Sequence, residues 1–285
     1  MPTFPAPAPV PVVVDVPFGA LHVVAGERDD VVVTVLPADP GRSGSVRAAE
    51  DTRVTRDGDA VTIVYPSQWK QWVLPFAAGG AHVTVEVPAG SDLRGRAGSL
   101  LAEGRLGEVD LALNGGDARL DEATRLDLRV SAGSVVVGRV TGRANVKASA
   151  GSVRIGQVAG DGTVRASNGT TTVGAVVGTL DVAGAHADVV VGTVRGTLTA
   201  RTAHAGIRVG SVDTGEVTLT SSYGTIEIGV PAGVAAWLDV SSEHGSVHHQ
   251  LTPADGPADG DATATVRAST GYGDVIVRRP EHLPA

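Results

Sequence analysis

The sequence of 285 residues has no cysteine, and only 3% of its residues are aromatic. Without cysteine the chain forms neither disulfides nor thiolate metal sites, and a cysteine nucleophile is excluded. With so few rings, the core has to be built from valine, alanine, leucine and isoleucine. Valine favours strands and the 38 glycines favour tight corners, so the composition predicts an all-β protein.

Long apolar runs and an excess of positive charge are also missing. No stretch approaches the ~18 apolar residues that a membrane-spanning helix needs. The proline-broken start MPTFPAPAPVPVVVDV lacks the basic region of a secretory signal. We therefore expect no transmembrane segment and a cytoplasmic location. The net charge of −8 disfavours nucleic acid as a partner.

A short phrase recurs through most of the chain. SAGSVVVGRV, which starts at Ser131, returns as SAGSVRIGQV from Ser149. A small anchor residue recurs every 17 to 21 residues, most often after 18, at Gly98, Gly116, Gly133, Gly151, Gly169, Ala187, Ala205, Gly224 and Gly245. Gly273 is a further, degenerate anchor behind the insertion LTPADGPADGDAT. Such a fixed period is typical of repeat architectures.

Each repeat alternates with period two. Val153 and Ile155 flank Arg154, Gly156 follows, and a second alternating strand comes after a short corner. This pattern indicates two strands with one buried face. An antiparallel meander would alternate in the same way. The recurrence of like residues at like positions favours a single-stranded β-solenoid, or β-helix, with coils of ~18 residues stacked ~4.8 Å apart.

Four segments follow from these patterns. Residues 1–9 are expected to form a disordered Pro/Ala-rich tail, and residues 10–90 an N-terminal antiparallel β region that caps the coils. Residues 91–279 are expected to form the β-solenoid repeats, and residues 280–285 a tail. The strand DVIVRRP, which ends in charge and proline, is expected to close the stack.

The ordered set of phrases carries a family resemblance. GSVVVGRVTG, NGTTTVGAVVGTL, YGTIEIGVPAGVAAWLDV and STGYGDVIVRR resemble the "putative adhesin" or toastrack-like β-strand-repeat family, domain of unknown function 4097, in its actinobacterial form. The N-terminal VVVDVPFGALHVVAGERDDVVVTVLPADP and the loop WKQWVLPFAAGG resemble it as well. The resemblance implies a β-strand-repeat fold, no established reaction and no catalytic residues.

Aromatic residues gather in one loop, YPSQWKQWVLPFAAGG, which carries Trp69, Trp72 and Phe76. Three interpretations are open. The loop plugs the mouth of the solenoid, or it forms a contact patch for a protein partner, because tryptophan is enriched at interface hot spots. The third interpretation is a contact with a membrane surface.

The residue before each anchor forms a column that includes His186 and His204. As stacked neighbours, these two imidazoles could share a transition metal, with Asp188 or His244 as the third ligand. The alternative interpretation is a ladder of rings that stack on each other at a corner.

Charged residues form a second column, made of Arg129, Lys147, Arg165 and Arg201. This basic column is either a solvated face with lateral charge pairs or a groove for a polyanion or an acidic glycan. Carboxylates concentrate elsewhere, at Asp110, Asp117, Asp121, Glu122 and Asp127. They lack the pair in register that a glycosidase or a Ca²⁺ site would need.

Taken together, the sequence favours a non-enzymatic, adhesin-like β-repeat scaffold that uses no cofactor. Its partner would be an unknown protein, or a second copy bound through the ends. A binding module for a polyanion or glycan along the basic column is the first alternative. A carbohydrate-active β-helix enzyme is the second.

Overall fold

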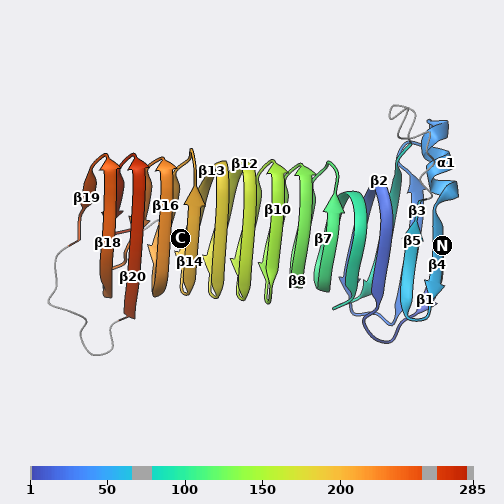
Figure 1. The fold of residues 1–285 in the computed structure, drawn as a ribbon. Coiled ribbons are helices and arrows are strands. Elements are labelled where there is room, and N and C mark those ends of the chain that lie inside the picture. Colours follow the sequence, from blue (N-terminus) through green and yellow to red (C-terminus); the bar gives the residue numbers. More distant parts are fainter. Residues whose placement is uncertain (1, 66–78, 252–261, 281–285) are drawn as a thin grey trace. The chain divides into compact units, whose positions relative to one another are not determined.

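The computed structural model describes residues 2–65, 79–251 and 262–280, and within them the chain is nearly all β (Figure 1). It divides into two compact units, residues 1–141 and residues 142–285. The described part of the first unit contains β1 (Thr3–Pro5), β2 (Pro11–Gly26), β3 (Asp30–Pro37), α1 (Ser43–Asp51), β4 (Arg53–Asp57), β5 (Ala60–Val64), β6 (Ala81–Pro88), β7 (Asp92–Leu113), β8 (Ala118–Ala132) and β9 (Val135–Val140).

In the first unit, parallel pairing begins earlier than the glycine repeat. β2 pairs in parallel with β5, β6 and β7, and β7, β8 and β9 continue the parallel pairing. Antiparallel pairs join β1 to β3, β3 to β6 and β4 to β5. The antiparallel region expected at residues 10–90 therefore needs correction, because β2 already forms a parallel coil. Its valines alternate inward without the glycine spacing that marks the later coils.

Two further corrections concern the N-terminal residues. Residues 1–9 are not a disordered tail throughout, because β1 pairs with β3 and the Ala6 N–H donates to the Asp29 carbonyl oxygen at 2.7 Å. The helix α1 was not expected from the sequence either. It is only nine residues long, too short for a helical period to stand out, and it buries Ser45 and Ala48. It contacts β3 and β6.

The second unit is a β-solenoid of parallel coils, as the repeat predicted. Its strands are β10 (Ala144–Ala150), β11 (Val153–Val158), β12 (Asp161–Val176), β13 (Thr179–Val194), β14 (Thr197–Thr202), β15 (Ile207–Val212), β16 (Gly215–Tyr223), β17 (Ile226–Gly229), β18 (Val234–His244), β19 (Val247–His249), β20 (Ala262–Tyr272) and β21 (Val275–Arg278). Equivalent residues lie side by side, so that Val173 pairs with Val191 and Val191 with Val209. The meander interpretation is excluded for this unit.

The last two coils are stacked in the reverse of their sequence order. β20 pairs with β16 on one side and β18 on the other, and β21 lies between β17 and β19 in the same way. The order β16, β20 and β18 can be followed in Figure 1. The segment DVIVRRP therefore does not close the stack, which is a correction. The outermost coil of the second unit is β18 and β19.

Hydrophobic burial explains this exchange. The inward residues of β20 and β21, among them Val266, Val275 and Val277, are fully buried. The outer coil is more polar on its inward side, where Ser242 and His249 stand. Burying an aliphatic side chain contributes about 1.5–3 kcal/mol, so the more apolar coil takes the position that is covered on both sides.

Glycine corners set the shape of each coil. Val173 and Val176 are both buried although two residues separate them, so the chain turns at Gly174. A Cβ added to Gly192 would lie 2.4 Å from the carbonyl oxygen of Gly174, and one added to Gly210 would lie 2.7 Å from that of Gly192. No side chain fits such a contact. The repeated glycines are therefore required by the close approach of one coil to the next.

Because neighbouring coils approach closely at the corners, adding one methyl group to a corner glycine should reduce the unfolding free energy only where the new atom meets the neighbouring backbone. In Gly138→Ala, the new Cβ would lie 2.4 Å from the Asp121 carbonyl oxygen. We expect this variant to lose about 1–3 kcal/mol of unfolding free energy, measured by urea denaturation. The matched control is Gly115→Ala in the same unit, where the nearest atom is 4.0 Å away. Equal losses in the two variants would contradict the explanation.

Candidate functional site

Five aromatic rings form a continuous stack in the second unit. The stack runs through His186, His204, Tyr223, Tyr272 and His244, with centroid distances of 5.0, 5.1, 4.8 and 4.5 Å. Each ring comes from the same corner of its coil, because parallel register places Tyr223 beside Tyr272 and Tyr272 beside His244. We call this set the ring column.

The expected neighbourhood of His186 and His204 is confirmed, and their geometry favours a ring ladder over a metal site. Their planes are within 9° of parallel. An imidazole nitrogen presents its lone pair in the ring plane, so two parallel rings do not converge on one ion. In the described part of the chain, no group of three or more metal-ligating side chains comes together. The Asp188 carboxylate, proposed as a third ligand, instead accepts the Gly206 N–H.

Sequence reasoning missed Tyr272, which separates Tyr223 from His244 in the column. The signal was available, since Tyr272-Gly273 repeats Tyr223-Gly224. It was missed because the stack was assumed to follow sequence order.

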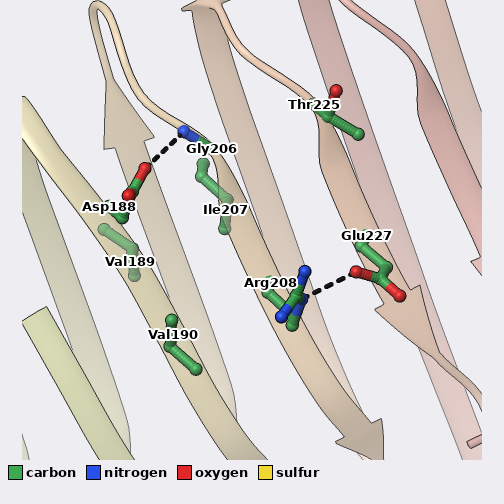
Figure 2. Close-up of a pocket in the computed structure, with 8 residues that line it drawn as sticks. All are labelled: Asp188, Val189, Val190, Gly206, Ile207, Arg208, Thr225 and Glu227. Atoms are coloured by element: carbon green, nitrogen blue, oxygen red, sulfur yellow. Dashed lines mark hydrogen bonds and ion pairs between the residues drawn. The ribbon is translucent and has the colours of Figure 1, made fainter. Parts of the chain in front are cut away.

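A shallow pocket of about 240 Å³ lies on the β13, β15 and β17 side of the ring column. It is hollow because Gly206 stands between Asp188 and Thr225 without a side chain. Figure 2 shows Asp188 directed at the Gly206 N–H, which it binds at 3.0 Å, and Arg208 directed at Glu227. The polar groups of the pocket are thus largely engaged with each other.

Glu227 is the most strongly held carboxylate of this pocket. It accepts hydrogen bonds from the Nε atoms of Arg208 and Arg278, each at 2.7 Å. Burial opposes ionisation of Glu227, but the hydrogen bonds from Arg278 and Arg208 outweigh it, so its pKa lies below the ordinary value of 4.5. The arrangement stabilises a carboxylate rather than a proton donor, which suits an ion-pair network better than acid–base chemistry.

Carboxylates also bind backbone groups at the corners. Asp117 accepts the Ser134 N–H at 2.8 Å, and Asp274 accepts the Ser246 N–H at 2.9 Å. Asp121, from the predicted acidic concentration, accepts the Gly104 N–H at 3.1 Å. Two other members of that concentration, Asp110 and Asp127, pair with Arg129. These contacts give the acidic residues structural roles.

The basic column divides between the two units. Arg129 belongs to the first unit. In the second unit, Lys147 lies in register with Arg165, and Arg201 follows two coils later with Ala183 between. Arg201 pairs with Asp181 at 3.6 Å. All four basic side chains are exposed.

The aromatic loop of the sequence, residues 65–80, lies almost entirely outside the described residues. Trp69, Trp72 and Phe76 lie outside the described residues. Among the residues that are described, no helix has the length and apolar character to cross a bilayer.

Parallel coils, glycine corners and stacked rings define a β-strand-repeat protein of the solenoid class. The Toastrack DUF4097 family model matches residues 23–279. The chain therefore belongs to the Toastrack family, as the resemblance implied. No curated protein matches it at the sequence level.

Several solved structures align with most of the chain at low identity. A "putative adhesin" from Bacteroides fragilis has 10% identity, covers 97% of this chain and 95% of its own, and gives a TM-score of 0.31. A "putative adhesin" from Parabacteroides distasonis has 14% identity, coverages of 96% and 95%, and a TM-score of 0.33. A "putative lipid binding protein" from the same organism has 10% identity, coverages of 96% and 95%, and a TM-score of 0.37.

The Glu227 network predicts an acid-sensitive contribution to stability. Because the folded-state pKa of Glu227 is lowered, its contribution is complete above the ordinary pKa of 4.5 and is lost as the pH falls through the folded-state value. We expect Glu227→Gln to lose about 1 kcal/mol of unfolding free energy at pH 7, since the arginine partners Arg208 and Arg278 are partly exposed to solvent. The stabilities of Glu227→Gln and the wild type should converge as the pH falls below 4.5 and through the folded-state pKa of Glu227, measured by urea denaturation across pH. A difference that is constant with pH would contradict the role of the charge.

Proposed function

We propose that the protein is a non-enzymatic β-repeat scaffold that acts through protein–protein contacts, and that its principal contact is self-association through β18 and β19. The observation that supports this function is the open edge of that coil. A cytoplasmic location remains a prediction from the sequence.

The outer coil keeps its inward side chains partly exposed. Leu238 and Val240 are half-buried and Val247 is 39% exposed. Their register partners in the next coil, Val266, Ala268 and Val275, are buried. Within residues 2–65, 79–251 and 262–280, no strand pairs with the outer side of β18 or β19.

An uncovered strand edge is a template for another strand. β18 is eleven residues long and contains no proline, and its charged residues Asp239 and Glu243 lie on the outward face, so no inward charge blocks edge pairing. A second copy of this chain suits the edge, because a twofold axis pairs one strand with its own equivalent. The inward residues of both copies, among them Leu238 and Val240, would then continue one core.

The proposed dimer predicts opposite effects for neighbouring substitutions. In Val240→Lys, a charge enters the inward face of β18, and we expect dissociation into monomers. Ser241→Lys is the matched control, because adjacent strand residues point to opposite faces, and it should associate like the wild type. Sedimentation equilibrium over a concentration series measures both. A wild-type chain that stays monomeric at high micromolar concentration would refute self-association.

The basic column supports a second candidate function, the binding of a polyanion. Lys147 and Arg165 lie in register on β10 and β12, are exposed, and have no ion-pair partner in the described part of the chain. Two adjacent uncompensated cations favour a ligand with regularly spaced negative charge.

This second function predicts salt-sensitive binding of heparin, used as a model polyanion. Arg165→Glu should weaken binding at least tenfold, because it replaces attraction with repulsion. Arg154→Glu, which changes another exposed arginine, on β11, should have a much smaller effect. Isothermal titration at two salt concentrations distinguishes the outcomes. Equal losses in the two variants would indicate only a non-specific effect of net charge.

We also infer that the protein has no catalytic role. The acidic residues that could serve a β-helix hydrolase are held by corner N–H groups or by arginines, as in the contacts of Asp117 with Ser134 and of Asp110 with Arg129. Arg28 and Glu227, whose pKa values are shifted, both lie in ion pairs. Arg28 pairs with Asp30 and Glu86, and Glu227 pairs with arginines, so both shifts accompany surface ion pairs.

A further inference from the structure

A hollow of about 340 Å³ lies on the other side of the ring column, where β16, β20 and β18 run side by side. Its volume falls in the range of about 300–1,000 Å³ that is typical of small-molecule sites. The lining includes Ser222, Tyr223, Ser241, Glu243, Ser269 and Tyr272. Nearly every one of these side chains carries a hydroxyl group, which is an unusual concentration for a surface hollow.

Most of these hydroxyl groups are available to a ligand. The buried hydroxyls at the edge of the hollow are already used, since Ser221 donates to the Ala205 carbonyl and Thr270 to the Gly224 carbonyl. The exposed hydroxyls of Ser222, Ser241 and Ser269 make no hydrogen bond within the described part of the chain. Each can donate and accept at once.

The electrostatic character of the hollow is acidic. Glu243 is exposed and has no ion-pair partner among the described residues. The nearest cation in the strand pattern, Arg267, already pairs with Glu216 and packs over the Trp237 ring. The hollow therefore disfavours a negatively charged ligand and accepts a neutral or cationic one.

An exposed aromatic surface lies along the same face of β18. Trp237 is 57% exposed, and its place in the strand puts it on the same side as Ser241 and Glu243. Ser241 follows Trp237 by four positions, a distance of about 13 Å along the strand. The guanidinium carbon of Arg267 lies 5.6 Å from the indole centroid, which orients the ring.

We propose that the outer face of β16, β20 and β18 binds a neutral or amino-sugar oligosaccharide. The hydroxyl-lined hollow holds one sugar unit, whose hydroxyl groups exchange hydrogen bonds with Ser222, Ser241 and Ser269. Glu243 accepts a hydrogen bond from a hydroxyl or an amino group. Trp237 stacks against the C–H face of a more distant unit. This site uses outward side chains of β16, β20 and β18 and not the backbone groups of the open edge, so it does not depend on self-association.

The chemistry of this face favours a sugar over a peptide. Peptides are commonly recognised through apolar pockets or through strand addition at an open edge. The hollow presents hydroxyl groups on the outward side of the strands, and the backbone groups of β16 and β20 are already used in the sheet on both sides. A sugar matches that surface, because each of its hydroxyl groups can both donate and accept a hydrogen bond.

The full chain is tested against an array of neutral, amino-sugar and acidic oligosaccharides, and the bound members are then titrated by calorimetry. We expect neutral or amino-sugar members to bind and acidic members not to bind at this site. Trp237→Ala and Glu243→Gln should each weaken binding about tenfold or more. Both side chains are exposed, so the melting temperature should change little, and this is measured in parallel.

The control variant is Asp161→Asn, which removes an exposed carboxylate on β12 of the same unit and should bind like the wild type. The proposal is overturned if no neutral or amino-sugar member binds at millimolar concentration. It is also overturned if the affinities of Trp237→Ala and Glu243→Gln equal that of the wild type. Binding that is confined to acidic members and lost in Arg165→Glu would assign the ligand to the basic column instead.

Discussion

The parallel register between successive coils is the constraint on which the second unit depends. When Val173 pairs with Val191 and Val191 with Val209, every position in one coil lies over its equivalent in the next. The core is then a set of aliphatic columns. The corners become columns too, and there the backbone approaches so closely that Gly192 has no room for a methyl group above Gly174. The parallel register thus explains both the aliphatic core and the glycine content of the corners.

The same register concentrates surface chemistry. Histidine or tyrosine occupies the same corner position in several coils. The result is the ring column of His186, His204, Tyr223, Tyr272 and His244. Where a glycine interrupts an outward row, as Gly206 does, a hollow opens between neighbours. The hollow at Gly206 therefore marks a missing side chain in a regular outward row, and it is not a cleft between separate elements.

Much of this architecture could be predicted from the sequence, because the glycine spacing and the alternation both report local backbone geometry. The stacking of His186 on His204 followed directly from the repeat length. The position of Tyr272 could not be derived this way, since the order of coils depends on which one is better buried, and that is decided by tertiary packing. The helix Ser43–Asp51 and the β1 strand were missed because short segments carry too little pattern.

The exchanged order of the last two coils has a consequence for how the chain acquires its structure. The ribosome completes β18 and β19 before β20 and β21, yet the later segment supplies the only described strands against which the earlier one pairs. During synthesis the edge of β16 and β17 therefore stays unpaired until β20 and β21 have been made. In this unit β18 and β19 find their partner strands only after β20 and β21 have been inserted, and until then two strand edges stay open to association with other nascent chains.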